Sequence, residues 1–300
     1  MRLIALALLI ASPAAAQTVT TEGDGSRTLV VEALVPGQHA AIWHAVSTAE
    51  GWKSWAVPAA WLNGDILETA YDPAAQPGGA NTIQQRIVES VPGRSFVFRT
   101  IKTPQGFPHA RAFMQVTHFL QLMPEAGGVR VRLTDKGYPA GAEGDELLGF
   151  FKSGNQQTLD HLAAHFGLAP LAFLTGHCWR GTLPNGATDT HCFKAANGQV
   201  TDHHDVAAGG KVVYGGDTVY RWSGGAIGWT YKDADGGVMP GTVKAAPDGL
   251  NFGTADYTGP DGTKITIATR WIRVGDTAYD ARDTSSLPAH NHTTRYTRID

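Results

Sequence analysis

Both cysteines of the 300-residue chain and four of its twelve histidines fall between residues 176 and 206. Asp189 and Asp202 lie in the same stretch, close in sequence to His191 and His204. Imidazole and carboxylate groups can bind zinc or another divalent metal, and one imidazole can bind haem iron. A histidine beside an aspartate can also serve as a general base. Which chemistry applies depends on which of these side chains meet in the fold.

The turns in this stretch determine which residues face each other. Asn-Gly pairs at 185–186 and 197–198 are typical of tight β-hairpin turns. If residues 184–186 form a three-residue loop, Cys178 lies opposite Cys192. Directly opposed strand residues have Cβ atoms about 4.5–5.5 Å apart, so a small adjustment allows a disulfide. The spacing therefore predicts a Cys178–Cys192 disulfide, which would leave no thiol for catalysis.

The second turn brings the histidines together on one face of the predicted hairpins. A two-residue turn at 197–198 places His191 opposite His204, and alternate positions of a strand share a face. That face collects His177, Trp179, Asp189, His191, Asp202 and His204, whereas Cys178, Cys192 and His203 lie on the other. The candidate metal ligands are thus His191, His204, Asp189 and Asp202. The alternatives are a solvent-exposed face, or histidines and aspartates that satisfy each other by hydrogen bonds, and we predict no resident cofactor.

The first sixteen residues have the pattern of a secretory signal peptide. Arg2 precedes an apolar run at 3–10, and three alanines at 14–16 offer a cleavage site. The run is too short to span a bilayer, and no second stretch of membrane length follows it. We therefore expect export to the periplasm or the medium, where a two-cysteine chain most simply carries one disulfide.

Composition and charge exclude several classes of partner. The net charge is −3, or −4 without Arg2, and there is no basic run, so nucleic acid and anionic membranes are poor candidates. No Gly-x-Ser-x-Gly, no phosphate-binding glycine loop and no helix-opening Gly-x-Gly-x-x-Gly occurs. Thirty-six glycines and eight tryptophans, with only 17% charged residues, favour tightly turned β-structure with large apolar interiors.

Between residues 27 and 167 the pattern combines strands and helices. Hydrophobic alternation predicts strands, and three- to four-residue spacing predicts helices. The predicted strands are 27–35, 61–68, 81–91, 94–102, 112–123 and 128–135, and the predicted helices are 37–48, 49–55 and 146–166. This order predicts an α+β domain, in which one antiparallel sheet is crossed by a long terminal helix.

The same span resembles the START-like or SRPBCC superfamily, in its Hsp90-ATPase-activator-homologue type. The resemblance rests on Val31-Glu32-Ala33, on the run from Ile42 to Gly51 with Trp55, and on matches at 81–83, 92–94 and 104–108. It implies a helix-grip fold at 17–167, with a curved sheet around the last helix and a deep apolar cavity. The family's paired glycine after the second strand is absent here.

The cavity implied by this resemblance has candidate ligand-contacting residues. Its wall would be formed by Phe96, Phe98, Phe150 and Phe151, with Trp52 and Trp55 at its mouth. His118 interrupts an otherwise apolar alternation in the strand 112–123. It is a candidate ligand contact and a candidate catalytic acid or base, and the alternative is a hydrogen-bonded core histidine.

Residues 168–300 lack helical periodicity. Short alternating segments separated by Asn, Asp, Gly and Pro predict an up-and-down barrel or a sandwich. The opening stretch 173–181 is similar to the first-strand Gly-x-Trp of lipocalin-like barrels, which favours the barrel and implies that Trp179 points inward. Trp179, Tyr220, Trp222 and Trp229 could then contact an aromatic ligand, or could fill the core.

Together these features predict an exported two-domain protein that binds a hydrophobic or aromatic small molecule. The ligand would occupy a START-like cavity with an adjoining β-barrel. One alternative is an enzyme of cyclase or hydrolase type that uses a cavity histidine. Another is a metal- or haem-binding barrel. A co-chaperone role is disfavoured, because export would separate the protein from a cytosolic chaperone.

Overall fold

A computed structural model describes residues 17–300, and the predicted signal peptide lies outside them. The chain divides into two compact units, and the division falls between Asp160 and His161. We keep the predicted domain limits, 17–167 and 168–300, as a proposal. Among the residues that the structure describes, no helix is long and apolar enough to cross a membrane.

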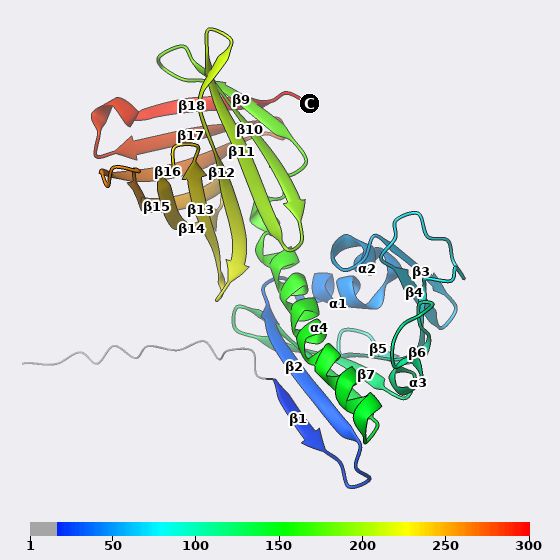
Figure 1. The fold of residues 1–300 in the computed structure, drawn as a ribbon. Coiled ribbons are helices and arrows are strands. Elements are labelled where there is room, and N and C mark those ends of the chain that lie inside the picture. Colours follow the sequence, from blue (N-terminus) through cyan, green and yellow to red (C-terminus); the bar gives the residue numbers. More distant parts are fainter. Residues whose placement is uncertain (1–16) are drawn as a thin grey trace, which may run out of the picture. The chain divides into compact units, whose positions relative to one another are not determined.

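The first unit is an eight-stranded antiparallel sheet with four helices (Figure 1). The strands lie in the order β1-β2-β8-β7-β6-β5-β4-β3. They are β1 (Thr18–Thr21), β2 (Arg27–Val35), β3 (Ala59–Asn63), β4 (Ile66–Ala70), β5 (Ile83–Val91), β6 (Ser95–Lys102), β7 (Thr117–Glu125) and β8 (Gly128–Tyr138). The helices are α1 (His39–Ser47), α2 (Ala49–Trp55), α3 (Ala110–Phe113) and α4 (Ala142–Gly167). The predicted α+β helix-grip class is confirmed.

One predicted strand of this unit is in fact two. Residues 61–68 are not continuous, because the chain turns at Gly64 and Asn63 pairs with Ile66 across a hairpin. Gly64 has φ +59°, a left-handed conformation that glycine adopts without a steric penalty. Hydrophobic alternation continues through the turn, and for that reason the sequence pattern did not reveal it.

Helix α4 contacts the sheet through its inward side chains. The ring of Phe151 stacks on Phe113 with centroids 4.6 Å apart, and Asn155 donates a hydrogen bond to Asp135 of β8. Leu147 and Leu159 are buried on the same helix. Glu143 and Asp145 lie in its first turn, where negative charge is favoured by the helix dipole. A polar side chain from α4 therefore reaches a buried carboxylate of the sheet.

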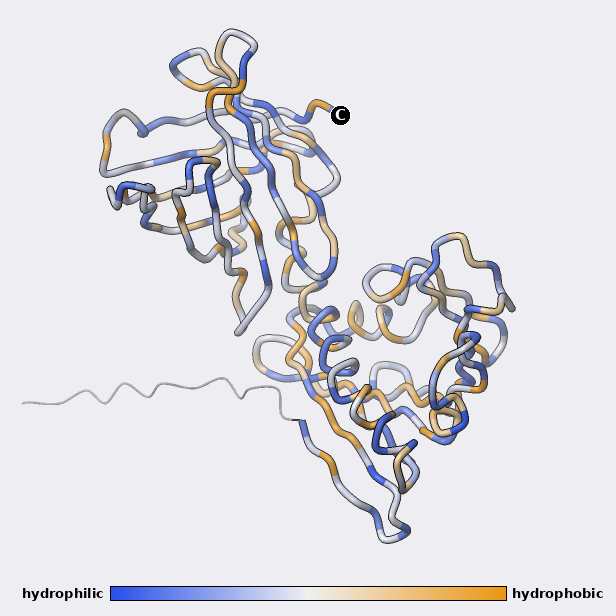
Figure 2. The backbone as a smooth tube through the Cα atoms, in the orientation of Figure 1, coloured by the Kyte–Doolittle hydropathy of each residue, from blue (hydrophilic) through white to orange (hydrophobic). Residues whose placement is uncertain are grey.

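The second unit is a closed barrel of ten antiparallel strands. Each strand pairs with the next along the chain, and β9 closes the barrel by pairing with both β10 and β18. The strands are β9 (Cys178–Thr182), β10 (Thr188–Ala196), β11 (Gln199–Ala208), β12 (Lys211–Ser223), β13 (Ala226–Asp233), β14 (Val238–Ala246), β15 (Gly249–Thr258), β16 (Lys264–Val274), β17 (Ala278–Ser285) and β18 (His292–Arg298). Hydrophobic and hydrophilic segments alternate at short intervals along these strands (Figure 2). The structure therefore has the predicted up-and-down barrel and not a sandwich.

One apolar core cluster joins the barrel wall to the segment that precedes it. Leu171 of the 3-10 helix η1 (Ala169–Leu171) and Leu174 are fully buried in this cluster with Trp179. Gly167 lies directly against Trp222, since a Cβ at Gly167 would be 2.1 Å from Trp222 Cδ2. These contacts fill the barrel interior around Trp179. A second 3-10 helix, η2 (Pro288–His290), connects β17 to β18.

Candidate functional site

The predicted hairpin register is confirmed at every pair that we derived. Cys178 lies opposite Cys192, and the two form a disulfide. His191 lies opposite His204 on β11. Trp179 is fully buried in the core cluster of the barrel, so the face that it shares with His191 points inward. The polar cluster of the barrel, Asp189, His191, Asp202 and His204, is therefore an interior feature.

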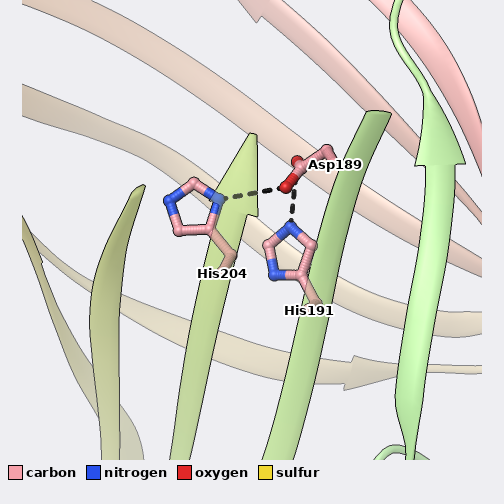
Figure 3. A group of neighbouring side chains, drawn as sticks. All are labelled: Asp189, His191 and His204. Carbon is pink, nitrogen blue, oxygen red and sulfur yellow. Dashed lines mark hydrogen bonds and ion pairs between the residues drawn. The ribbon is translucent and has the colours of Figure 1, made fainter. Parts of the chain in front are cut away.

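His191 lies between two carboxylates. Its Nδ1 is 2.7 Å from Asp202 Oδ2, and its Nε2 is 3.1 Å from Asp189 Oδ2. Figure 3 shows His191 and His204 both directed at Asp189. Ionised carboxylates only accept hydrogen bonds, so both ring nitrogens of His191 must carry a proton. The geometry thus fixes His191 as an imidazolium ion.

The pKa values of the pair agree with this geometry. Burial by itself would lower the pKa of His191, but the charges and hydrogen bonds of Asp202 and Asp189 outweigh burial and raise it to about 10. Burial would likewise raise the pKa of Asp189, and hydrogen bonds from His191 and His204 instead hold it well below its usual range. At neutral pH the positive charge of His191 therefore lies beside the negative charge of Asp189.

Tyrosines from later strands complete the hydrogen bonding of the cluster. His204 Nδ1 is 3.2 Å from Asp189 Oδ1, and its Nε2 is 3.0 Å from Tyr231 Oη. Tyr231 donates to Tyr214 Oη at 2.6 Å, and Tyr296 donates to Asp189 Oδ2 at 2.8 Å. Our sequence analysis did not connect these three tyrosines with the cluster. Alternation along their strands places them inward, but only closure of the barrel brings β18 next to β9.

The cluster forms part of the wall of a cavity of about 380 Å³ inside the barrel. The remaining wall combines aliphatic with aromatic side chains, and the aromatic ones include Tyr220, Trp229, Phe252 and Trp271. Tyr220 and Trp229 thus line this cavity, and their contact with a ligand stays a prediction. Trp179 and Trp222 are placed differently: Trp179 lies in the packed core, and half-buried Trp222 lies against Gly167.

The cluster also has ligand groups for a metal ion. Asp189, His191 and His204 each offer one ligand atom, and these atoms lie within 4.8 Å of one another. Asp202 contacts the other nitrogen of His191 and would orient that ring. A metal would need the lone pair of His191 Nε2, which carries a proton at neutral pH. A metal at this position would therefore compete with that proton.

A second buried polar network lies in the first unit, around His118. His118 of β7 lies opposite Asp135 of β8, and its Nδ1 is 2.6 Å from Asp135 Oδ1. Tyr138 and Asn155 both donate to Asp135 Oδ2, at 2.8 and 2.6 Å. Three donors thus surround a fully buried carboxylate. The predicted polar residue has a partner set that sequence analysis did not identify, because Asn155 is far away on α4.

His118 is enclosed by aromatic rings on its remaining sides. Phe98 stacks on it with centroids 5.0 Å apart, and Phe113 meets it edge-on at 5.5 Å. Within residues 17–300, His118 Nε2 is buried and has no hydrogen-bond partner. In the tautomer whose Nδ1 donates to Asp135, Nε2 would be an acceptor without a partner. This arrangement suits a hydrogen bond to a ligand or the removal of a proton.

The other predicted cavity residues divide into buried and exposed groups. Phe96 and Phe98 are buried and pack against each other at a tilt, and Phe151 packs on Phe113. Phe150 is a correction, because 60% of its surface is exposed: its neighbour Phe151 takes the inward position on α4.

Trp52 and Trp55 pack together on α2 with ring centroids 5.3 Å apart. Their indole N–H groups donate to the carbonyls of Val46 and Ala45 in α1. Both side chains are half-buried, and these hydrogen bonds give them a role in joining the two helices. Their predicted place at the mouth of a cavity stays a prediction.

Comparison with known proteins concerns the first half of the chain. No curated protein matches the chain significantly. The chain is similar to the Aha1 dimer from Colwellia psychrerythraea, at 13% identity over 46% of this chain and 95% of that one, with a TM-score of 0.37. It is similar to CalU16 from Micromonospora echinospora, at 17% identity over 50% and 81%, with a TM-score of 0.35. The chain is also similar to the AHSA1-like protein from Aeromonas hydrophila, at 13% identity over 48% of this chain and 94% of that one, with a TM-score of 0.35.

A protein-family model gives the assignment. Residues 26–167 match the family described as polyketide cyclase / dehydrase and lipid transport. This span coincides with the part of the chain that resembles the START-like/SRPBCC superfamily. The match supports the SRPBCC type that was predicted for this part of the chain.

Proposed function

We propose that this protein is an exported binding protein for a hydrophobic or aromatic small molecule, and that the barrel cavity is a principal site. The observation that carries the proposal is an interior space of about 380 Å³ with aromatic walls and one preorganised polar cluster. Ligand sites in proteins commonly have volumes of about 300–1,000 Å³ and combine apolar walls with a few placed polar groups. The barrel cavity has this combination.

The first unit supports the same class of function. The family to which residues 26–167 match has lipid transport in its description, so an apolar ligand suits the START-like unit as well. The disulfide between Cys178 and Cys192 supports export, because disulfides persist in oxidising compartments. The likeness of the opening barrel strand to lipocalin-like barrels points in the same direction.

The test measures binding of N-phenyl-1-naphthylamine, a neutral aromatic probe whose fluorescence rises in apolar surroundings. Ala281 lines the cavity opposite Trp271, so Ala281→Phe should fill the space and abolish binding to the barrel. Thr284→Phe places the same ring on the exposed face of the same strand and should leave binding unchanged. Equal binding by the wild type and Ala281→Phe would refute the barrel site. Native mass spectrometry of exported protein would identify a co-purifying ligand.

The network around His118 supports a second candidate function, acid/base catalysis in the first unit. The bare Nε2 and the buried Asp135 on Nδ1 form a dyad in an aromatic setting. Nitrogen-15 NMR of the imidazole should show a neutral ring protonated on Nδ1. His118→Gln should abolish any turnover that is found while the fold is kept. An Nε2-protonated tautomer would exclude the role.

A further inference from the structure

The charge of the barrel cavity narrows the class of ligand, and this inference rests on the binding function proposed above. We propose that the barrel binds an organic cation, namely a protonated amine attached to an apolar or aromatic body. The inference follows from three features of the wall: its charged groups, an unpaired carboxylate oxygen and its aromatic rings.

The charged groups of the wall are mainly acidic. Asp189, Asp202 and Asp283 line the cavity, and of the described residues no lysine or arginine does so. His191 is the one group that geometry requires to be cationic, because both its nitrogens face carboxylates. It can offset only one of these three carboxylates, and the other histidines of the wall are His204, His290 and His292. It is also unable to pair with an anionic ligand, since both its N–H groups are already engaged.

Asp202 has an oxygen atom that the protein leaves unpaired. Its Oδ2 accepts from His191, whereas its Oδ1 is buried and has no hydrogen-bond partner in the part of the chain that the structure describes. Only 2% of the surface of Asp202 is exposed. A buried carboxylate oxygen without a donor is costly, typically about 1–3 kcal/mol. A ligand that donates an N–H group to Oδ1 would remove this cost.

Asp283 extends the acidic wall to β17. Its Oδ1 accepts from Thr269 at 2.6 Å, and His292 Nδ1 is 4.0 Å from its Oδ2. Burial raises the pKa of Asp283. A cation bound nearby would favour the ionised carboxylate, so ligand charge and wall charge would reinforce each other.

The aromatic part of the wall suits the same class of ligand. Phe252 and Trp271 pack with centroids 4.6 Å apart, and Trp229 meets Phe252 edge-on at 5.9 Å. The faces of indole and phenyl rings attract cations, by about 0.5–2 kcal/mol for each ring. The rings also bury the apolar body of a ligand. An amine on an aromatic body would therefore satisfy both parts of the wall.

The experiment compares three probes of nearly equal shape at pH 7: 1-naphthylmethylammonium, 1-naphthylmethanol and 1-naphthoate. Calorimetry or quenching of tryptophan fluorescence gives the three dissociation constants. The ammonium probe should bind at least about tenfold more tightly than the alcohol, and the carboxylate most weakly. Equal affinities for the three probes would overturn the charge preference and leave the binding function intact. If none of them binds, the binding function itself fails.

Variants locate the preference within the barrel. Asp202→Asn should bring the ammonium and alcohol affinities to within about threefold of each other, while alcohol binding persists. Asp283→Asn, on another strand, should also weaken ammonium binding relative to alcohol binding. It provides a second test if the Asp202→Asn variant does not fold. Asp280→Asn is the matched control, because Asp280 pairs with Arg295 and does not line the cavity. An Asp280 variant that lost as much ammonium affinity as the Asp202 variant would show a long-range charge effect and refute the site.

Discussion

Protonation of His191 should link the stability of the barrel to pH in a defined direction. A histidine with a pKa of about 10 in the folded protein and near 6.5 in the unfolded chain stabilises the fold fully below pH 6.5. This stabilisation falls by about 1.4 kcal/mol for each pH unit above 6.5 and is lost as the pH passes 10, which gives at most about 5 kcal/mol. Asp189, whose pKa is lowered, acts with the opposite sign and loses its contribution only in acid.

Two measurements check this link. An NMR titration should show the His191 ring still protonated at pH 8.5. Urea unfolding can be monitored through hydrogen exchange of segment 188–208. The stability of the barrel measured in this way should fall from pH 6.5 to pH 9.5. The His191→Gln variant should be less stable than the wild type at pH 6. Above pH 6 its free energy of unfolding should change little with pH.

The matched control is His203→Gln. His203 neighbours the cluster in sequence, but it points outward and pairs with Asp217 at 2.8 Å on the exposed face. Its hydrogen bond with Asp217 also raises the pKa of His203, but solvent screens this exposed pair, so its loss should reduce the alkaline slope much less than the loss of His191 does. A His191 titration midpoint between pH 6 and 7, with equal slopes in the wild type and His191→Gln, would refute the imidazolium assignment.

Three further predictions concern stability. Replacing Cys178 and Cys192 by alanine should cost about 3 kcal/mol, because a closed loop of about fifteen residues is released; a urea midpoint equal to that of the wild type would contradict this. Asp135→Asn should destabilise the first unit by about 3 kcal/mol or more, since three donors converge on the carboxylate that it removes. Unfolding of the purified full-length variant, followed by circular dichroism, would measure this loss. Gly167→Ala should cost about 1–3 kcal/mol because its Cβ would overlap Trp222; an unchanged melting temperature would show that the ring moves aside.

The barrel cluster could be predicted because its contacts are local. Asn-Gly turns fix hairpin register within a few residues, so the pairing of His191 with His204 followed from counting. Tyr296 could not be placed in this way, because it contacts Asp189 across more than one hundred residues and through the closing strand pair β18–β9. In the first unit, hydrophobic alternation singled out His118 but did not identify Asn155 on the crossing helix. Phe150 was placed wrongly, although helical spacing puts Phe151 and not Phe150 on the face of the buried Leu147, four residues earlier.

The two buried histidines, His191 and His118, differ in how many carboxylates contact the imidazole ring, and this number affects which ring nitrogens donate hydrogen bonds. His191 meets two carboxylates, so both nitrogens are donors and the ring is a fixed cation. His118 meets one carboxylate, and its second nitrogen has no hydrogen-bond partner among the described residues in its aromatic enclosure. Buried ionic groups of this kind stabilise a fold no better than apolar side chains of similar size would. Removal of one partner is nevertheless costly in either network, so each network holds its side chains in place. The atoms that the two networks leave without a partner, Asp202 Oδ1 in the barrel and His118 Nε2 in the first unit, are then the ones that a ligand could engage.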